Sequence, residues 1–117
     1  MKFILEGSIV PKARPRANPN GGRSFTPTNY RNWQKDAYKQ LNTQDKPSEP
    51  LSGVKVFIKL EGKHSRRGDC DNVAGSILDA LVKCDILKDD NLKQVRALSI
   101  ELVYSNSDPI ALIELEE

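Results

Sequence analysis

The alternating segment 54–60 limits the folds open to this chain more than any other part of the sequence. Apolar residues occupy every second position, and Lys55, Phe57 and Lys59 lie between them. A period of two is typical of a β-strand with one buried face, so this strand must lie in a sheet that other elements cover on one side. At 117 residues, the chain has the material for a single domain around such a sheet.

The flanking segments predict three more strands. We expect them over residues 2–10, 95–104 and 110–116, where apolar residues again alternate. The last two are expected to form a closing hairpin through the turn at 105–109, which contains Ser, Asn, Asp and Pro.

Two other segments have the spacing of amphipathic helices. The first begins at Thr26-Pro27, because Thr is a good N-cap and Pro is tolerated in the first turn. Its core-facing residues are expected to be Tyr30, Trp33, Ala37 and Leu41. The second helix, over about 72–84, is apolar on two sides, and we expect Leu78 and Val82 on its second side to contact another copy in a dimer. The predicted order is β-α-β-α-β-β, an α+β domain with two main helices against a mixed sheet.

Positive charge is concentrated at the N-terminal end. Residues 1–39 contain eight Lys or Arg and two acidic residues, a net charge of +6, whereas residues 40–117 contain ten basic and fourteen acidic residues. The loop over 11–25 is rich in Pro, Gly, Asn and Arg. Three basic residues on the first helix recur at every fourth position: Arg31, Lys35 and Lys39. These features indicate a surface for a polyanion, with a solvated helix face as the alternative for the helical stripe.

The sequence contains no predicted membrane span or secretory signal. No stretch approaches the roughly 18 apolar residues of a membrane helix. The N-terminus is interrupted by Glu6 and lacks a small-residue cleavage site. Cys70 and Cys84 lack CxxC spacing, so we expect reduced thiols rather than a disulfide or a zinc site. We therefore expect a cytoplasmic protein without a membrane partner.

A D-x-D motif, Asp69 and Asp71, stands at the start of the second predicted helix. Carboxylates at a loop-to-helix junction can turn towards one point, and hard divalent cations such as Mg²⁺ prefer oxygen ligands. The Asp89-Asp90 turn offers a third carboxylate. A structural role is the alternative, because Asp favours the N-cap and the positive end of the helix dipole. The motif alone leaves both interpretations open.

Several short strings surround this motif. HSRRGDCDN at 64–72 is followed by LDALVK at 78–83 and ILKDDN at 86–91, and PKARPR at 11–16 precedes Thr26-Pro27. Together they resemble the RusA family of Holliday junction resolvases, over most of the chain and most specifically over 64–95. The resemblance implies one RusA-like endonuclease domain over 1–117. It also implies a homodimer, often of phage origin, that cuts four-way DNA junctions with Mg²⁺ or Mn²⁺ in DNA recombination and repair.

The resemblance assigns metal binding and catalysis to three aspartates: Asp69, Asp71 and Asp90. Asp89 competes for the third place, but the second Asp of that pair matches the family's ligand. Asn72 matches as well and is expected to cap the helix or to orient Asp71. The cofactor is expected to be Mg²⁺, with Mn²⁺ as the other possibility.

Gly75 departs from the family pattern, which commonly has a functional Lys one turn after the second Asp. Either another cation replaces it or the enzyme is a slower nuclease. The loop candidates are Lys63, Arg66, Arg67 and Lys88. Close approach of another backbone segment is an alternative reason for a glycine in mid-helix. Asp79, about 12 Å along the helix from Asp71, is expected to be structural and able to pair with Lys83.

A set of basic residues is expected to bind DNA phosphates: Lys12, Arg14, Arg16, Arg23, Arg31, Lys35, Arg66 and Arg67. His64 is expected to be exposed or to contact phosphate rather than to act as a general base. Two other functions remain open. One is a branched-DNA-binding module with weak or no cleavage, and the other is a structural metal site in a protein without a DNA role.

Overall fold

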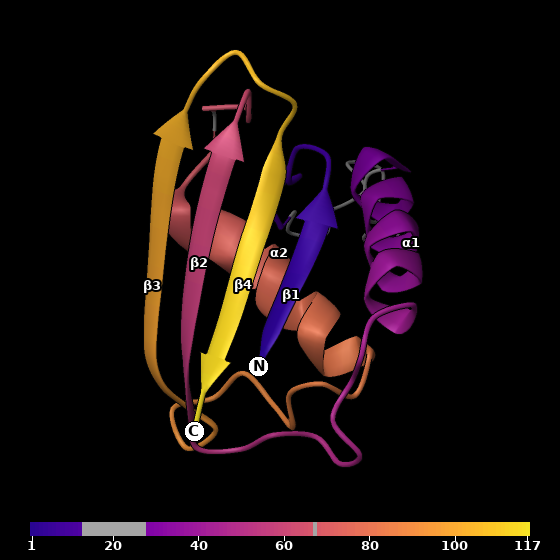
Figure 1. The fold of residues 1–117 in the computed structure, drawn as a ribbon, viewed down its shortest axis with the longest axis vertical. Helices are drawn as coiled ribbons and strands as arrows, with labels where there is room; N and C mark the ends of the chain where they lie inside the picture. The colour runs from indigo at the N-terminus through magenta and orange to yellow at the C-terminus, as the bar shows by residue number, and fades with distance from the viewer. Residues whose placement is uncertain (13–27, 67) are drawn as a thin grey trace, which may run out of the picture.

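A four-stranded sheet, with one helix across its face and the other beside an edge strand, forms the described part of the chain, residues 1–12, 28–66 and 68–117 (Figure 1). The structure is a computed structural model. Its elements in chain order are β1 (Lys2–Glu6), α1 (Thr28–Asn42), β2 (Val54–Gly62), α2 (Cys70–Lys83), β3 (Val95–Tyr104) and β4 (Ile110–Glu116). This order and the mixed sheet confirm the predicted α+β fold with two main helices.

The strands lie in the order β1-β4-β2-β3. β4 pairs antiparallel with both β1 and β2, whereas β3 pairs parallel with β2. The predicted hairpin of β3 and β4 is therefore wrong, because α2 makes a β2-α2-β3 crossover and β4 then returns between β2 and β1. Burial accounts for this order. The inward side chains of β4 are at most 1% exposed, as a central strand requires, whereas β3 is exposed at most positions.

The first strand is shorter than the predicted 2–10 and ends at Glu6. Gly7 has a φ of 99°, which turns the chain out of the strand. The residues that follow run to α2 and contact its first turns. This shortening matters for the site, because it brings the segment ending at Lys12 onto the helix.

Helix α2 supplies the centre of the core. Ile77 and Leu81 are 0% exposed and pack in the same cluster as the inward residues of β2. Leu78 is 7% exposed, and Val82 is partly buried against the same cluster. The second apolar side of α2 is thus covered within the chain, and the prediction that it contacts another copy is wrong.

Helix α1 packs as its spacing predicts, with Tyr30, Ala37 and Leu41 buried and Trp33 partly buried. Two glutamines attach it to the free edge of β1. Gln40 accepts a hydrogen bond from the Glu6 amide (2.6 Å) and donates to the Glu6 carbonyl (3.0 Å). Gln44 does the same with Ile4, at 2.9 and 2.6 Å. The two side-chain amides therefore satisfy backbone groups that an edge strand otherwise leaves unpaired.

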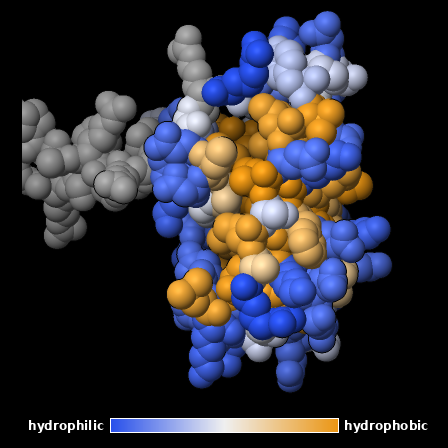
Figure 2. All heavy atoms as spheres, turned by 90° about the vertical axis from the view of Figure 1, so that its left-hand side faces the viewer, coloured by the Kyte–Doolittle hydropathy of each residue, from blue (hydrophilic) through white to orange (hydrophobic). Residues whose placement is uncertain are grey.

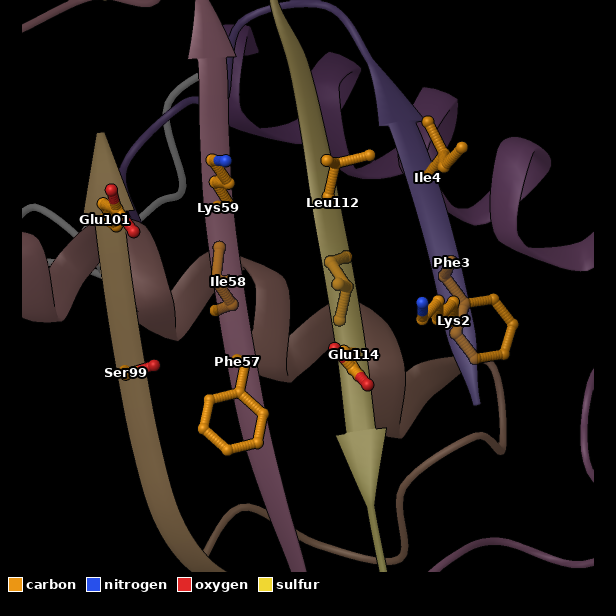
Figure 3. Close-up of a pocket in the computed structure, with 11 residues that line it drawn as sticks. Lys2, Phe3, Ile4, Phe57, Ile58, Lys59, Ser99, Glu101, Leu112 and Glu114 are labelled. Carbon is orange, nitrogen blue, oxygen red and sulfur yellow. The ribbon is translucent and has the colours of Figure 1, made fainter. Parts of the chain in front are cut away.

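The outer face of the sheet is a solvated surface. It contains a shallow depression of about 600 Å³, whose lining includes Phe57 and Leu112 (Figure 3). Opposite charges face each other across neighbouring strands there, Lys2 opposite Glu114 and Lys59 opposite Glu101. Within this face the Lys59 ammonium pairs with Glu61 at 3.3 Å. Alternating opposite charges stabilise an exposed sheet face, so the residues around the depression have a structural explanation.

Cys70 is exposed and Cys84 is buried, and both are free thiols as predicted. Among the described helices, none combines the length and apolarity that a membrane span requires.

Candidate metal and DNA site

The start of α2 presents Asp69 and Asp71 to solvent. Asp69 is the N-cap residue, and its carbonyl accepts the Val73 amide at 3.0 Å, but its side chain makes no capping hydrogen bond. Asp71 lies in the exposed first turn. The capping explanation therefore does not account for the Asp69 carboxylate. It is open to solvent and available for a cation or a water network.

The segment that follows β1 lies directly against this end of α2. The Lys12 amide donates to the Asn72 carbonyl (2.8 Å), and the Ser76 hydroxyl donates to the Val10 carbonyl (2.6 Å). A Cβ on Gly68 would lie 2.7 Å from the Pro11 ring, and Gly68 has a φ of 96°. Only glycine satisfies both the backbone angle and the close approach at position 68. The segment that ends at Lys12 thus reaches the site along a defined path.

Asp79 pairs with Lys12 and not, as predicted, with Lys83. The Lys12 ammonium lies 3.0 Å from a carboxylate oxygen of Asp79. This hydrogen bond raises the pKa of Lys12; burial opposes the rise, and the negative charges of Asp79 and Asp90 support it. Lys12 therefore remains an ammonium at any physiological pH. A contact between residues so distant in sequence outweighs the i,i+4 pairing that helix spacing suggested.

The two carboxylates of the Asp89-Asp90 turn differ in their contacts. Asp89 accepts hydrogen bonds from the Asp90 amide (2.8 Å) and from the Asn91 side chain (3.2 Å). It therefore closes the turn. The exposed Asp90 carboxylate makes no such contact within the described residues. Asp90 is thus the freer of the two for a ligand.

Asp90 borders a hollow of about 190 Å³ next to the second half of α2. Its lining is Gln34, Tyr38, Asp79, Val82, Lys83, Asp89 and Asp90. The structure thereby brings Asp90 beside Asp79, whereas Asp69 and Asp71 lie at the other end of the same helix. Within residues 1–12, 28–66 and 68–117, no group of three or more His, Cys, Asp or Glu side chains is placed to hold a metal ion. The three-aspartate metal site stays a prediction.

The donor chemistry nevertheless fits Mg²⁺. Asp69, Asp71 and Asp90 offer exposed carboxylate oxygens, and Mg²⁺ typically takes one or two protein carboxylates together with several waters and substrate phosphate. One or two of these carboxylates are therefore enough to bind the ion, at either end of α2.

His64 is buried, which corrects the expectation that it is exposed or contacts phosphate. It is 3% exposed, and its Nε2 donates to the Ile110 carbonyl at 2.7 Å. That hydrogen bond holds the loop after β2 to the start of β4. Beside it, the Arg66 guanidinium stacks over the Tyr104 ring at 4.2 Å. The loop after β2 is therefore held at both His64 and Arg66. A stacked Arg keeps its hydrogen-bond donors for a phosphate.

Four of the eight residues predicted to bind DNA lie in the described part of the chain. Lys12, Arg31, Lys35 and Arg66 are exposed; they lie on the segment after β1, on α1 and in the loop after β2. The other four lie outside the described residues: Arg14, Arg16, Arg23 and Arg67. Sequence reasoning missed the pairing of Lys12 with Asp79. The signal that pointed to it was Gly75, a mid-helix glycine for which close approach of another segment was one explanation.

Comparison with known proteins gives two matches. The family model for endodeoxyribonuclease RusA matches residues 6–116. The crossover junction endodeoxyribonuclease RusA of Aquifex aeolicus (strain VF5) is 34% identical over 92 residues, which are 79% of this chain and 73% of that protein.

Proposed function

This chain belongs to the RusA family of endodeoxyribonucleases, and we propose that it resolves four-way DNA junctions in recombination and repair by metal-dependent phosphodiester hydrolysis. The observation that carries the proposal is the exposed D-x-D at the start of α2, where the Asp69 side chain makes no capping hydrogen bond and against which the segment ending at Lys12 packs. Free carboxylates and a lysine held against the same helix suit the hydrolysis of a polyanion better than they suit helix capping.

Asp69, Asp71 and Asp90 are the proposed ligands of Mg²⁺, with Mn²⁺ as the alternative. When bound, such an ion activates a water nucleophile and neutralises charge on the scissile phosphate. The chain's own contribution is to hold Asp69 and Asp71 at the start of α2 and Asp90 in the turn that follows the helix, and to bind the DNA backbone through Lys12, Arg31, Lys35 and Arg66. Binding through phosphates falls steeply with salt and follows DNA shape more than base sequence. A cytoplasmic location and a single domain over 1–117 stay predictions.

The test is incubation of the purified protein with labelled four-way, three-way and linear duplex DNA, with and without Mg²⁺. We expect paired nicks in the four-way junction that require the metal. One observation favours a second candidate: the described carboxylates do not gather as a metal site. A branched-DNA-binding module would retain the junction at low salt and give no product with Mg²⁺ or Mn²⁺, and that outcome would replace our proposal.

We also propose that the enzyme acts as a homodimer, because two symmetric cuts need two active sites. The surface that supports this is the β3 side of the molecule, where apolar side chains gather between hydrophilic ends (Figure 2). Leu98, Leu102 and Tyr104 on β3 are 40–44% exposed, although they point to the same face as the buried residues of β2. Exposed apolar residues of this kind, on an edge strand, are typical of protein interfaces.

Leu102→Glu is expected to weaken the dimer. A charge at the centre of an apolar interface costs about 2 kcal/mol or more, roughly a 30-fold rise in the dissociation constant. Sedimentation velocity between micromolar and nanomolar concentration measures the change. The matched control is Ile4→Glu, which places the same charge on a 49% exposed apolar residue at the opposite side of the sheet. A wild-type protein that is monomeric at micromolar concentration, or equal effects of both variants, would exclude this interface.

A further inference from the structure

Lys12 takes a path that depends on the absence of a side chain at Gly75. A Cβ built on Gly75 would lie 3.3 Å from Cδ and 3.7 Å from Cβ of Lys12. The aliphatic stem of Lys12 therefore lies directly across the helix at this position. Beyond the glycine, its ammonium reaches Asp79 at 3.0 Å.

Three helical residues define the stripe that Lys12 crosses. Asp71, Gly75 and Asp79 are spaced four apart on α2, so they lie one above another on one face of the helix. A larger residue at 75 would fill the space between the two carboxylates with its own side chain. Here that space is filled from outside the helix. The ammonium of Lys12 therefore lies on this stripe, between the D-x-D and the Asp89-Asp90 turn.

The position of Lys12 is determined by several contacts and not by its ion pair alone. Its backbone is hydrogen-bonded to Asn72, and the two residues before it contact Ser76 and Gly68. The side chain is 46% exposed, so the ammonium is open to a ligand while its stem is packed. Asp79 holds the ammonium, and Asp90 contributes to its electrostatic surroundings.

We propose that Lys12 is the phosphate-binding cation of the cleavage site, laid across Gly75 from the N-terminal segment and positioned by Asp79. None of the loop candidates, Lys63, Arg66, Arg67 or Lys88, is needed for this role. The inference rests on the proposed nuclease function. It adds that a residue far from the D-x-D in sequence acts on the scissile phosphate.

The first test is Lys12→Met, which keeps an aliphatic stem over Gly75 and removes the charge. We expect the cleavage rate at saturating junction to fall about 100-fold, the size of effect seen when one donor to a developing negative charge is lost. The matched control is Lys83→Met, which removes a charge from the rim of the Asp90 hollow and should leave the rate unchanged. Thermal unfolding should give the same midpoint for all three proteins.

A second readout needs neither metal nor cleavage. Junction binding in EDTA is measured at increasing salt, and Lys12→Met should lower the slope of log affinity against log salt by about 1, as expected for one lost phosphate contact. A purely structural lysine would leave this slope unchanged.

The decisive test is rescue by moving the charge into the helix. In the Lys12→Met background, Gly75→Lys should restore cleavage to within about tenfold of wild type, whereas Gly75→Met should not. Both substitutions place a long side chain at the same position, so only the ammonium distinguishes them. Rescue by Met, equal losses in Lys12→Met and Lys83→Met, or an unchanged rate in Lys12→Met would overturn the assignment of Lys12. A wild-type protein that cuts no junction would instead defeat the proposed function itself.

Discussion

Asp71→Asn is expected to lower the rate of junction cleavage by about 1000-fold or more, equivalent to roughly 4 kcal/mol of transition-state stabilisation. The substitution preserves shape and removes the charge that a divalent cation requires. Asp71 is exposed in the first turn of α2, so folding should be unaffected. Junction binding in EDTA should persist or become tighter, because one negative charge beside the DNA is gone. Single-turnover cleavage and gel retention measure the two effects separately.

The control for this prediction removes the same charge from a neighbouring site. Asp89→Asn retains a side-chain oxygen that can accept the Asp90 amide, and it should cleave like the wild type. Asp90→Asn should be as impaired as Asp71→Asn if Asp90 is the third ligand. Equal activity of Asp71→Asn and wild type would remove the D-x-D from the mechanism. If Asp89→Asn cleaves slowly and Asp90→Asn cleaves like the wild type, Asp89 and not Asp90 is the third ligand.

Gly62→Ala is expected to destabilise the fold by about 3 kcal/mol. Gly62 has a φ of 98°, and a Cβ there would lie 2.5 Å from the Asp108 carbonyl oxygen and 2.8 Å from that of Ser107. Both atoms belong to the backbone of the β3-β4 connection, which is hydrogen-bonded to the end of β2 through Lys63 and Ser105. The clash therefore cannot be relieved by rotating a side chain.

Gly7→Ala provides the matched comparison. Gly7 has nearly the same φ, 99°, and a Cβ there meets no atom of the described residues within 4 Å. It should cost only the backbone strain, about 1 kcal/mol. Urea unfolding of the two variants, followed by circular dichroism, separates strain from collision. Equal losses of unfolding free energy would show that the contact with the β3-β4 connection has no energetic weight.

The sequence was sufficient to predict the helices and strands but not to predict which of them lie side by side. Periodicity identified the strands and both helices, because burial of one face leaves a local pattern. The hairpin of β3 and β4 was predicted wrongly because both strands alternate in the same way, and no local pattern says which one lies at the centre of the sheet. Similarly, the two-sided apolar pattern of α2 gave no indication that α1 and the core cover its second side.

The candidate site was predictable as a set of residue types and only partly as an arrangement. The D-x-D stands at the start of α2 as expected, and the contacts of Asp89 leave Asp90 as the freer carboxylate. The path of Lys12 across Gly75 is a contact between distant segments, about which helical spacing carries no information. The burial of His64 depends on the start of β4 in the same way.

The attachment of Gln40 and Gln44 to β1 determines how far self-association can proceed. A sheet with two open edges can add further sheets at both ends and polymerise into a fibre. In this chain the two glutamines already occupy one edge, and β3 forms the other. Among the described strands, edge-to-edge association can then use only the β3 side of each copy. Such growth closes after a single step, which gives a particle of fixed stoichiometry and not an open-ended aggregate.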